Sequence, residues 1–120
     1  SPDCQEAAFQ ENGIIYAVSL NGGEPRKLLN GLTHYYVLRW TRDGRYIIAQ
    51  ALDDTSGWFL PISEIWKIPV QGGTPLKLDL TIAGMENFAL HPDNRHFAYS
   101  VNDGTREELW VMENFLPELK

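Results

Sequence analysis

Two histidines that flank a short turn, His91 and His96, are the first residues whose type and spacing suggest chemistry. Two imidazoles can ligate a metal ion, but a metal site normally needs further histidine, cysteine or carboxylate ligands at defined geometry. Asp93 lies between them. Its place in the sequence favours a structural role, in which the carboxylate accepts hydrogen bonds from nearby backbone amides and starts the turn. We therefore expect no metal site.

Patterns that would indicate catalysis or cofactor binding are missing from the sequence. The Gly-x-Ser-x-Gly motif of α/β-hydrolases is absent. Two glycine pairs lie between expected strands, without the helix and lysine that follow a phosphate-binding loop. We interpret these residues as turn glycines: Gly22, Gly23, Gly72 and Gly73. Cys4 has no histidine or lysine within a few residues to activate it. The sequence predicts a protein that is not an enzyme, with no catalytic residue and no cofactor.

Composition and charge exclude further classes of protein. The chain has 120 residues, of which 43% are hydrophobic and 22% are charged, enough apolar side chains for a folded core. A net charge of -6 without a basic stripe argues against a nucleic acid partner. The longest apolar run, Ile14–Val18, is far shorter than the roughly 20 residues of a membrane-spanning helix. A single cysteine excludes an internal disulfide.

The elements that carry these residues repeat along the chain. Residues 15–28 align with residues 65–78, and one Ile, two Gly, one Pro, one Lys and one Leu coincide. Residues 40–49 align with residues 90–99 at the same offset of 50, and residues 1–5 match the start of this second motif. A repeat of roughly 40 to 50 residues built from short strands is typical of a β-propeller blade.

Short runs rich in aromatic and β-branched residues predict the strands of these repeats. They cover Tyr35–Trp40, Tyr46–Ala51, Ile65–Val70 and Leu76–Leu80. Asp43-Gly44 favours a tight hairpin turn because both positions tolerate positive φ, and Asn94 takes the same place in the next copy. No segment has a helical period, so we expect an all-β fold.

Counting strands predicts a partial β-propeller of about two and a half four-stranded antiparallel blades. Residues 1–31 form an incomplete blade without its innermost strand, residues 36–80 a complete blade, and residues 86–120 a C-terminal blade with three clear strands. A closed propeller typically needs four or more blades. We therefore expect the C-terminal part of a longer propeller, or a unit that closes only by self-association.

Residues that recur once in each repeat favour structural roles, because a catalytic residue is usually needed only once. Asp3, Asp43 and Asp93 recur at the start of the turn, where we expect them to fix the hairpin. Trp66 and Trp110 recur at one point of a strand, together with Tyr16. An aromatic side chain at a repeated position is best interpreted as packing between neighbouring sheets.

One segment breaks the repeat, an inserted loop at residues 53–63. It holds Trp58 and Phe59, flanked by Asp53 and Asp54. Insertions in single blades map to loops and often to binding surfaces, and aromatic residues are enriched in interface hot spots. These residues either bind a partner or fold back over the blade. Trp40, beside Arg39 on an innermost strand, is a further candidate contact that could line the central channel.

The repeated motifs resemble the TolB-like, WD40-like β-propeller repeat. In that repeat a Trp-Ser-Pro-Asp-Gly-Lys-type turn precedes an Ile/Leu-Trp strand and a Gly-Gly turn. The turn stands here at residues 1–5, 40–45 and 90–95, and the strand at Ile65-Trp66 and Leu109-Trp110, with Ile15-Tyr16 as a variant. The resemblance covers essentially the whole chain. Cys4, at the turn glycine, and Thr41-Arg42, in place of Ser-Pro, depart from it.

The resemblance implies a bacterial module of the periplasm or cell envelope that binds a protein or peptide. Related blades serve periplasmic binding proteins and the non-catalytic propellers of prolyl-peptidase-like enzymes. Two alternatives therefore stay open: an accessory propeller of such a hydrolase, and a sensory propeller of a bacterial signalling or transcription regulator. An isolated piece of a propeller exposes apolar faces at its two ends, so we also expect self-association.

Overall fold

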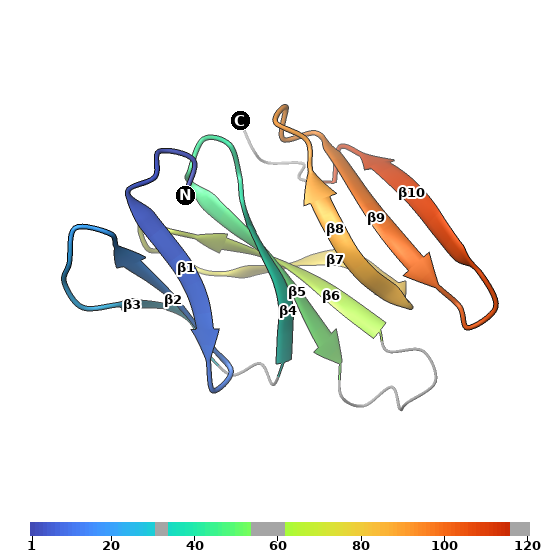
Figure 1. The fold of residues 1–120 in the computed structure, drawn as a ribbon, viewed down its shortest axis with the longest axis horizontal. Helices are drawn as coiled ribbons and strands as arrows, with labels where there is room; N and C mark the ends of the chain where they lie inside the picture. Colours follow the sequence, from blue (N-terminus) through green and yellow to red (C-terminus); the bar gives the residue numbers. More distant parts are fainter. Residues whose placement is uncertain (31–33, 54–61, 116–120) are drawn as a thin grey trace.

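The computed structural model describes residues 1–30, 34–53 and 62–115, and these residues form three antiparallel sheets (Figure 1). The first sheet contains β1 (Glu6–Glu11), β2 (Ile14–Ser19) and β3 (Arg26–Leu29) in that order. The middle sheet contains β4 (His34–Trp40), β5 (Tyr46–Asp53), β6 (Ile62–Pro69) and β7 (Leu76–Ala83). The third sheet contains β8 (Met85–Leu90), β9 (His96–Asn102) and β10 (Glu107–Glu113).

The predicted all-β class is confirmed for the described part of the chain. Every paired strand there is antiparallel, and the sheets contain three, four and three strands. None of the three sheets closes on itself. Within the same ranges no helix is long and apolar enough to cross a membrane.

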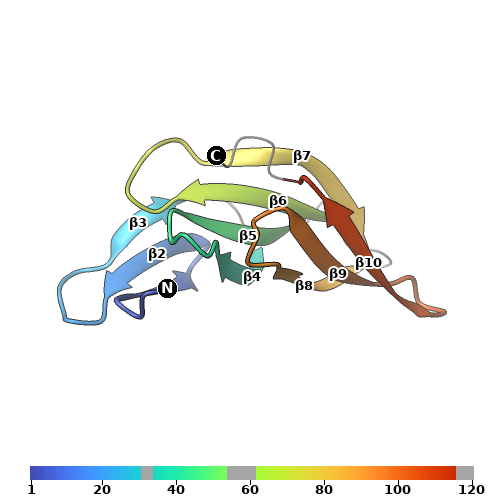
Figure 2. The same cartoon turned by 90° about the horizontal axis from the view of Figure 1, so that it is seen from above.

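The three sheets follow one another in chain order, with β4 of the middle sheet next to both neighbours. β4 contacts β1 on one side and β8 on the other, and β3 also contacts β6. Seen from above, the first and third sheets lie at opposite ends of the middle sheet (Figure 2). Each of them covers one face of the middle sheet, since the two buried clusters that join the sheets lie on opposite faces.

Alternation along β5 explains why both faces of the middle sheet are apolar. Successive side chains of a strand point to opposite faces, and Ile47, Ile48 and Ala49 are all fully buried. One face packs on the first sheet through a cluster of Ile15, Ile47, Ala49, Ala51, Ile68 and Val70. The other packs on the third sheet through Ile48, Ile65, Leu78, Ile82, Met85, Phe88, Phe97 and Phe115. Burial of each larger side chain stabilises the fold by roughly 1.5–3 kcal/mol.

One buried polar side chain crosses between two sheets. Gln50 on β5 donates from Nε2 to Ser63 Oγ at 2.9 Å and to the Met85 carbonyl at 3.1 Å. These bonds tie β5, β6 and the start of β8 together. A buried amide must find such partners because leaving it unpaired costs about 1–3 kcal/mol.

The strand boundaries extend beyond those predicted from sequence. The predicted complete blade, residues 36–80, corresponds to a sheet that runs from His34 to Ala83. Pairing of β6 with β7 continues past a bulge at Glu64/Trp66, so that Ser63 pairs with Ile82 and Ile62 with Ala83. Ser63 and Ile82 are both buried, and this tertiary contact holds the strand ends in the sheet.

The three repeated turns have the same backbone. The fourth residue of each has positive φ: 59° at Cys4, 73° at Gly44 and 57° at Asn94. Its amide donates to the carbonyl three residues earlier, at 3.0, 2.9 and 3.0 Å. In the middle turn positive φ falls on Gly44 and not on Asp43, which contributes its carboxylate instead.

A non-glycine residue in this left-handed region costs about 1–2 kcal/mol, less for asparagine. We expect Cys4→Gly to raise the free energy of unfolding by about 0.5–1 kcal/mol, because glycine adopts this φ without strain but loses more chain entropy on folding. Urea denaturation followed by tryptophan fluorescence measures the shift. Gly44→Ala, at the equivalent position, is the matched control and should lower stability. A lower urea midpoint for Cys4→Gly would show that the thiol has a role in the turn.

The β9–β10 hairpin depends on one carboxylate. Asp103 Oδ1 accepts hydrogen bonds from the Thr105 hydroxyl at 2.6 Å, the Thr105 amide at 2.9 Å and the Arg106 amide at 3.0 Å. These bonds, the Thr105 hydroxyl first, favour the charged form and lower the pKa of Asp103 from 3.8 to about 2.

A carboxyl with a lowered native pKa binds fewer protons in the folded than in the unfolded state. Its contribution to stability is therefore complete above pH 3.8 and is lost as the pH falls towards 2. We expect the urea midpoint of the chain to fall across this window, and to fall less steeply in Asp103→Asn, whose amide oxygen accepts the same bonds without titrating. An equal slope for both proteins would contradict the role assigned to Asp103.

Candidate functional site

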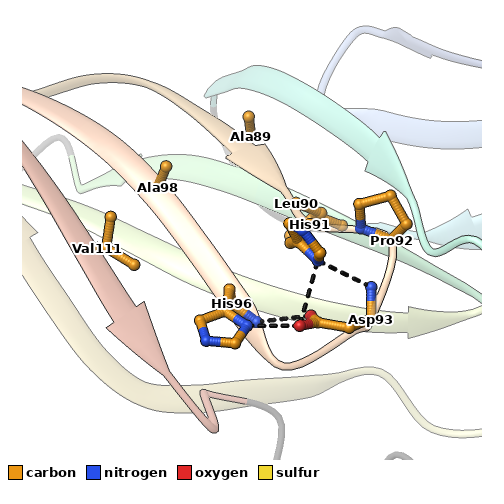
Figure 3. Close-up of a pocket in the computed structure, with 8 residues that line it drawn as sticks. All are labelled: Ala89, Leu90, His91, Pro92, Asp93, His96, Ala98 and Val111. Carbon is orange, nitrogen blue, oxygen red and sulfur yellow. Dashed lines mark hydrogen bonds and ion pairs between the residues drawn. The ribbon is translucent and has the colours of Figure 1, made fainter.

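The turn between β8 and β9 gathers two imidazoles around one carboxylate (Figure 3). Asp93 Oδ1 accepts the backbone amides of Arg95 at 2.7 Å and His96 at 3.1 Å. The other oxygen, Oδ2, lies 2.5 Å from His96 Nδ1 and 3.1 Å from His91 Nδ1. The turn thus uses one carboxylate oxygen, and the other faces both rings.

In the first two turns a different type of side chain contacts the aspartate. Asp3 and Asp43 also accept the amide two residues ahead, each at 3.0 Å. There the partner at the first turn position is a hydroxyl, which donates to the carboxylate from Ser1 at 2.7 Å and from Thr41 at 2.6 Å. Only the third of these turns has histidine at its first and sixth positions.

The charge state of Asp93 follows from its neighbours. Burial alone would raise the pKa of this carboxyl. Hydrogen bonds from the Arg95 amide and from the His96 ring and amide outweigh that effect, with a further contribution from His91. The pKa of Asp93 is therefore held well below its usual range, and the carboxylate is ionised at neutral pH.

A shallow hollow continues from these side chains over the outer face of the third sheet. Ala89, Ala98 and Val111 line it together with His91, Asp93 and His96. Beside the turn, His96 Nε2 lies 3.5 Å from Glu113 Oε1. The hollow is apolar over the strands and polar at the turn.

The apolar part of this surface belongs to a larger exposed area, here called the open face: Ala89, Ala98, Leu109 and Val111. Leu109 is 77% exposed and Val111 is 63% exposed. Leu109 takes the place in its repeat that Ile15 and Ile65 take in the first and middle sheets, where both are fully buried. In those two sheets the residue at this position packs against the sheet that follows.

Of the predicted partner-binding residues, the structure describes the side chains of Arg39 and Trp40. Arg39 bridges two sheets, since Nη2 donates to Asn87 Oδ1 at 3.4 Å and its guanidinium lies 5.9 Å from the Phe88 ring centroid. Trp40 is half-buried and packs on the cluster between the first and middle sheets. Both residues therefore contribute to junctions between sheets. Asp53 ends β5, and its side chain, like Asp54, Trp58 and Phe59, lies outside the described residues.

The two repeated tryptophans make the same local contact in different surroundings. Trp66 Nε1 donates to Glu64 Oε2 at 3.3 Å, and Trp110 Nε1 donates to Glu108 Oε2 at 3.0 Å. Trp66 packs against the cluster between the first and middle sheets. Trp110 is 51% exposed, because it lies on β10 at the edge of its sheet. The packing between sheets that the repeat predicts is present at Trp66 and not at Trp110.

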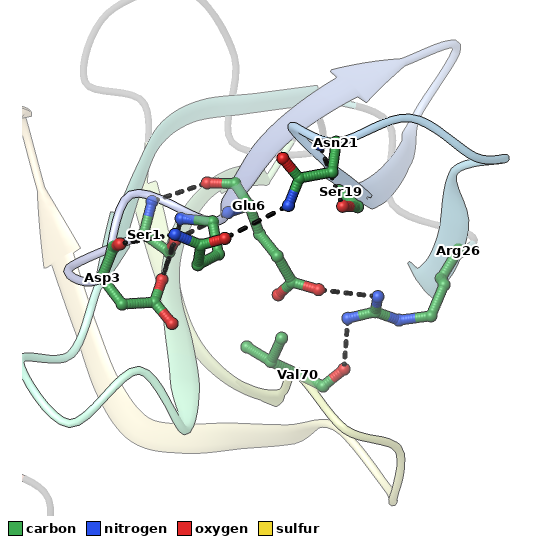
Figure 4. A network of polar contacts seen from close by, with 8 residues as sticks. Ser1, Asp3, Glu6, Ser19, Asn21, Arg26 and Val70 are labelled. Carbon is green, nitrogen blue, oxygen red and sulfur yellow. Dashed lines mark hydrogen bonds and ion pairs between the residues drawn. The ribbon is translucent and has the colours of Figure 1, made fainter.

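A polar network joins the first and middle sheets near the first turn (Figure 4). Arg26 donates from Nη1 to Glu6 Oε1 at 2.8 Å and from Nη2 to the Val70 carbonyl at 3.2 Å. Asn21 Nδ2 donates to Gln5 Oε1 at 3.2 Å beside it. Sequence reasoning missed this network because its members come from strands far apart in the chain and do not recur in the repeat.

Comparison with known proteins identifies no family. No protein-family model matches the chain, and no curated protein matches it significantly.

Proposed function

We propose that the chain is a β-propeller segment that binds protein and catalyses no reaction, and that its open face is the binding surface. Three features of the described residues support a propeller arrangement. The three sheets follow one another in chain order, their turns share one backbone, and β4 contacts β1 and β8. The TolB-like repeat motifs agree with this arrangement.

The exposure of Leu109 carries the proposal. A leucine that is 77% exposed stands where both earlier repeats bury an isoleucine against the next sheet. Burying such a side chain is worth roughly 1.5–3 kcal/mol, so covering the open face is favourable. We expect another sheet of the same kind to pack on the open face, because such a sheet packs on Ile15 and on Ile65, which take the place of Leu109 in the first and middle sheets.

The outer face of the first sheet in a second copy offers such a cover. Phe9 and Tyr16 stack there, with ring centroids 5.2 Å apart, and both are only partly buried. Phe9 pairs directly with Tyr16 across β1 and β2, on the side of the sheet opposite to the buried Ile15. We therefore expect a head-to-tail contact, in which the open face of one copy packs on the Phe9–Tyr16 face of the next. Contacts of this kind close into a ring or continue as an open chain.

The first test is the solution mass of the chain by light scattering coupled to size-exclusion chromatography, at rising concentrations. We expect the unmodified chain to associate and Leu109→Lys to remain a monomer, because a desolvated lysine opposes the packing. Leu76→Lys is the matched control: Leu76 is 51% exposed but lies on β7 of the middle sheet, outside both contacting faces, so its substitution should leave association unchanged.

Mixing two variants tests the head-to-tail geometry. Phe9→Lys blocks one face and Leu109→Lys the other, so each variant alone should be a monomer while an equimolar mixture forms a heterodimer through the two intact faces. Circular dichroism establishes that both variants are folded. A monodisperse, cooperatively melting monomer for the unmodified chain would refute the proposal, and hydrolase activity of the chain alone would refute its non-enzymatic part.

A further inference from the structure

The turn that joins β8 to β9 holds a set of donor atoms that its structural role does not require. His91, Asp93 and His96 each offer one ligand atom, and these atoms lie within 4.8 Å of one another. The turn itself forms without histidine, since Ser1 and Thr41 occupy the position of His91 in the other two copies, and Glu6 and Tyr46 occupy that of His96. Imidazoles are therefore not required to form the turn, although His91 Nδ1 accepts the Asp93 amide within it.

We propose that His91, Asp93 and His96 bind a divalent transition-metal ion of the zinc type. Imidazole nitrogen and carboxylate oxygen are preferred ligands of Zn²⁺, at about 2.0–2.2 Å. Atoms bound at that distance around a tetrahedral ion are roughly 3.3 Å apart. Side-chain rotations must therefore lengthen the 2.5 Å and 3.1 Å separations from Asp93 Oδ2 to the two rings slightly and shorten the widest separation in the set, which is up to 4.8 Å.

Two lone-pair atoms of the cluster face each other. His91 Nδ1 accepts the Asp93 amide at 3.2 Å, so it is the acceptor nitrogen of the neutral ring, and a metal ion bound there would replace this hydrogen bond. The same nitrogen lies 3.1 Å from Asp93 Oδ2, which is also a lone-pair atom. Two such atoms repel each other unless a proton or a metal ion lies between them. Asp93 Oδ2 is not engaged by the backbone amides of the turn, which bond to Oδ1.

Glu113 suits a supporting role in this site. Its Oε1 lies 3.5 Å from His96 Nε2, the ring nitrogen opposite the one that faces Asp93. A carboxylate on the far nitrogen of a metal-binding histidine fixes the tautomer and orients the ring. With three protein ligands, the fourth position is left to a water molecule. The prediction of no metal site rested on the lack of further ligands and on the turn role of Asp93, and the turn amides bond to only one oxygen of that carboxylate.

The test uses Zn²⁺ alone, titrated into the chelator-treated chain by isothermal calorimetry. We expect one ion per chain, and at least about a tenfold loss of affinity in His91→Ser and in His96→Tyr. These substitutions install the residues of the first and second turns, so the turn should persist. His34→Gln, which removes the remaining histidine of the chain, is the control and should bind normally.

Two further measurements exclude indirect effects. Co²⁺ in place of Zn²⁺ should give a visible absorption band that His91→Ser loses, while circular dichroism shows that the variant is folded. At chain concentrations low enough for the unmodified chain to be a monomer, Leu109→Lys should bind Zn²⁺ as tightly as the unmodified chain, which separates this site from the proposed association surface. The proposal is wrong if the unmodified chain does not bind Zn²⁺, or if His91→Ser and His96→Tyr bind it as tightly.

Discussion

A sheet with apolar side chains on both faces must be covered on both faces, and the rest of this structure depends on that constraint. β5 places Ile47 and Ile48 on opposite faces, both without exposure. No single neighbour can bury both residues, so the middle sheet needs one sheet on each side. The first and third sheets meet this need, and each thereby has one face left without a described neighbour. Turns, strand lengths and the polar contacts between sheets are secondary to this arrangement.

The repeat made much of the fold predictable, because the interactions that define it are local. An aspartate that accepts the amide two residues ahead, and a fourth residue with positive φ, require only the residues of the turn. The same local chemistry at residues 1–5, 41–45 and 91–95 therefore gave the same backbone three times. Strand positions followed from composition, and the predicted Tyr46–Ala51 differs from β5 by two residues at one end.

What sequence reasoning missed depends on contacts between residues far apart in the chain. The Arg26–Glu6 pair and the Arg26 bond to the Val70 carbonyl join residues that no local pattern relates. Trp66 and Trp110 occupy one repeat position but differ in exposure, because β6 is flanked by β7, whereas β10 is the edge strand of its sheet. The extension of β7 to Ala83 has the same origin, since buried Ile82 holds it in the sheet. The spacing of the two histidines was visible in the sequence. The sequence did not show that Asp93 Oδ1 accepts the turn amides while Oδ2 faces both rings.

The repeated turn keeps its backbone while the side chains at two of its positions differ between copies, which explains how one copy can acquire a metal-binding site. One carboxylate oxygen, together with backbone bonds and a polar side chain at the first position, holds the turn, and different polar side chains serve at the first and sixth positions. Hydroxyls fill the first position in two copies, and imidazoles fill both positions in the third, next to the open face.

A sheet packed on that face would exclude water from the hollow beside His91 and His96, and a drier site strengthens the attraction between a cation and the Asp93 carboxylate. Metal binding and association would then reinforce each other, and linkage requires the effect to be equal in both directions. Zinc titrations of the unmodified chain at rising concentration, compared with Leu109→Lys, measure that coupling directly: an affinity that does not depend on chain concentration would mean that the two sites act independently.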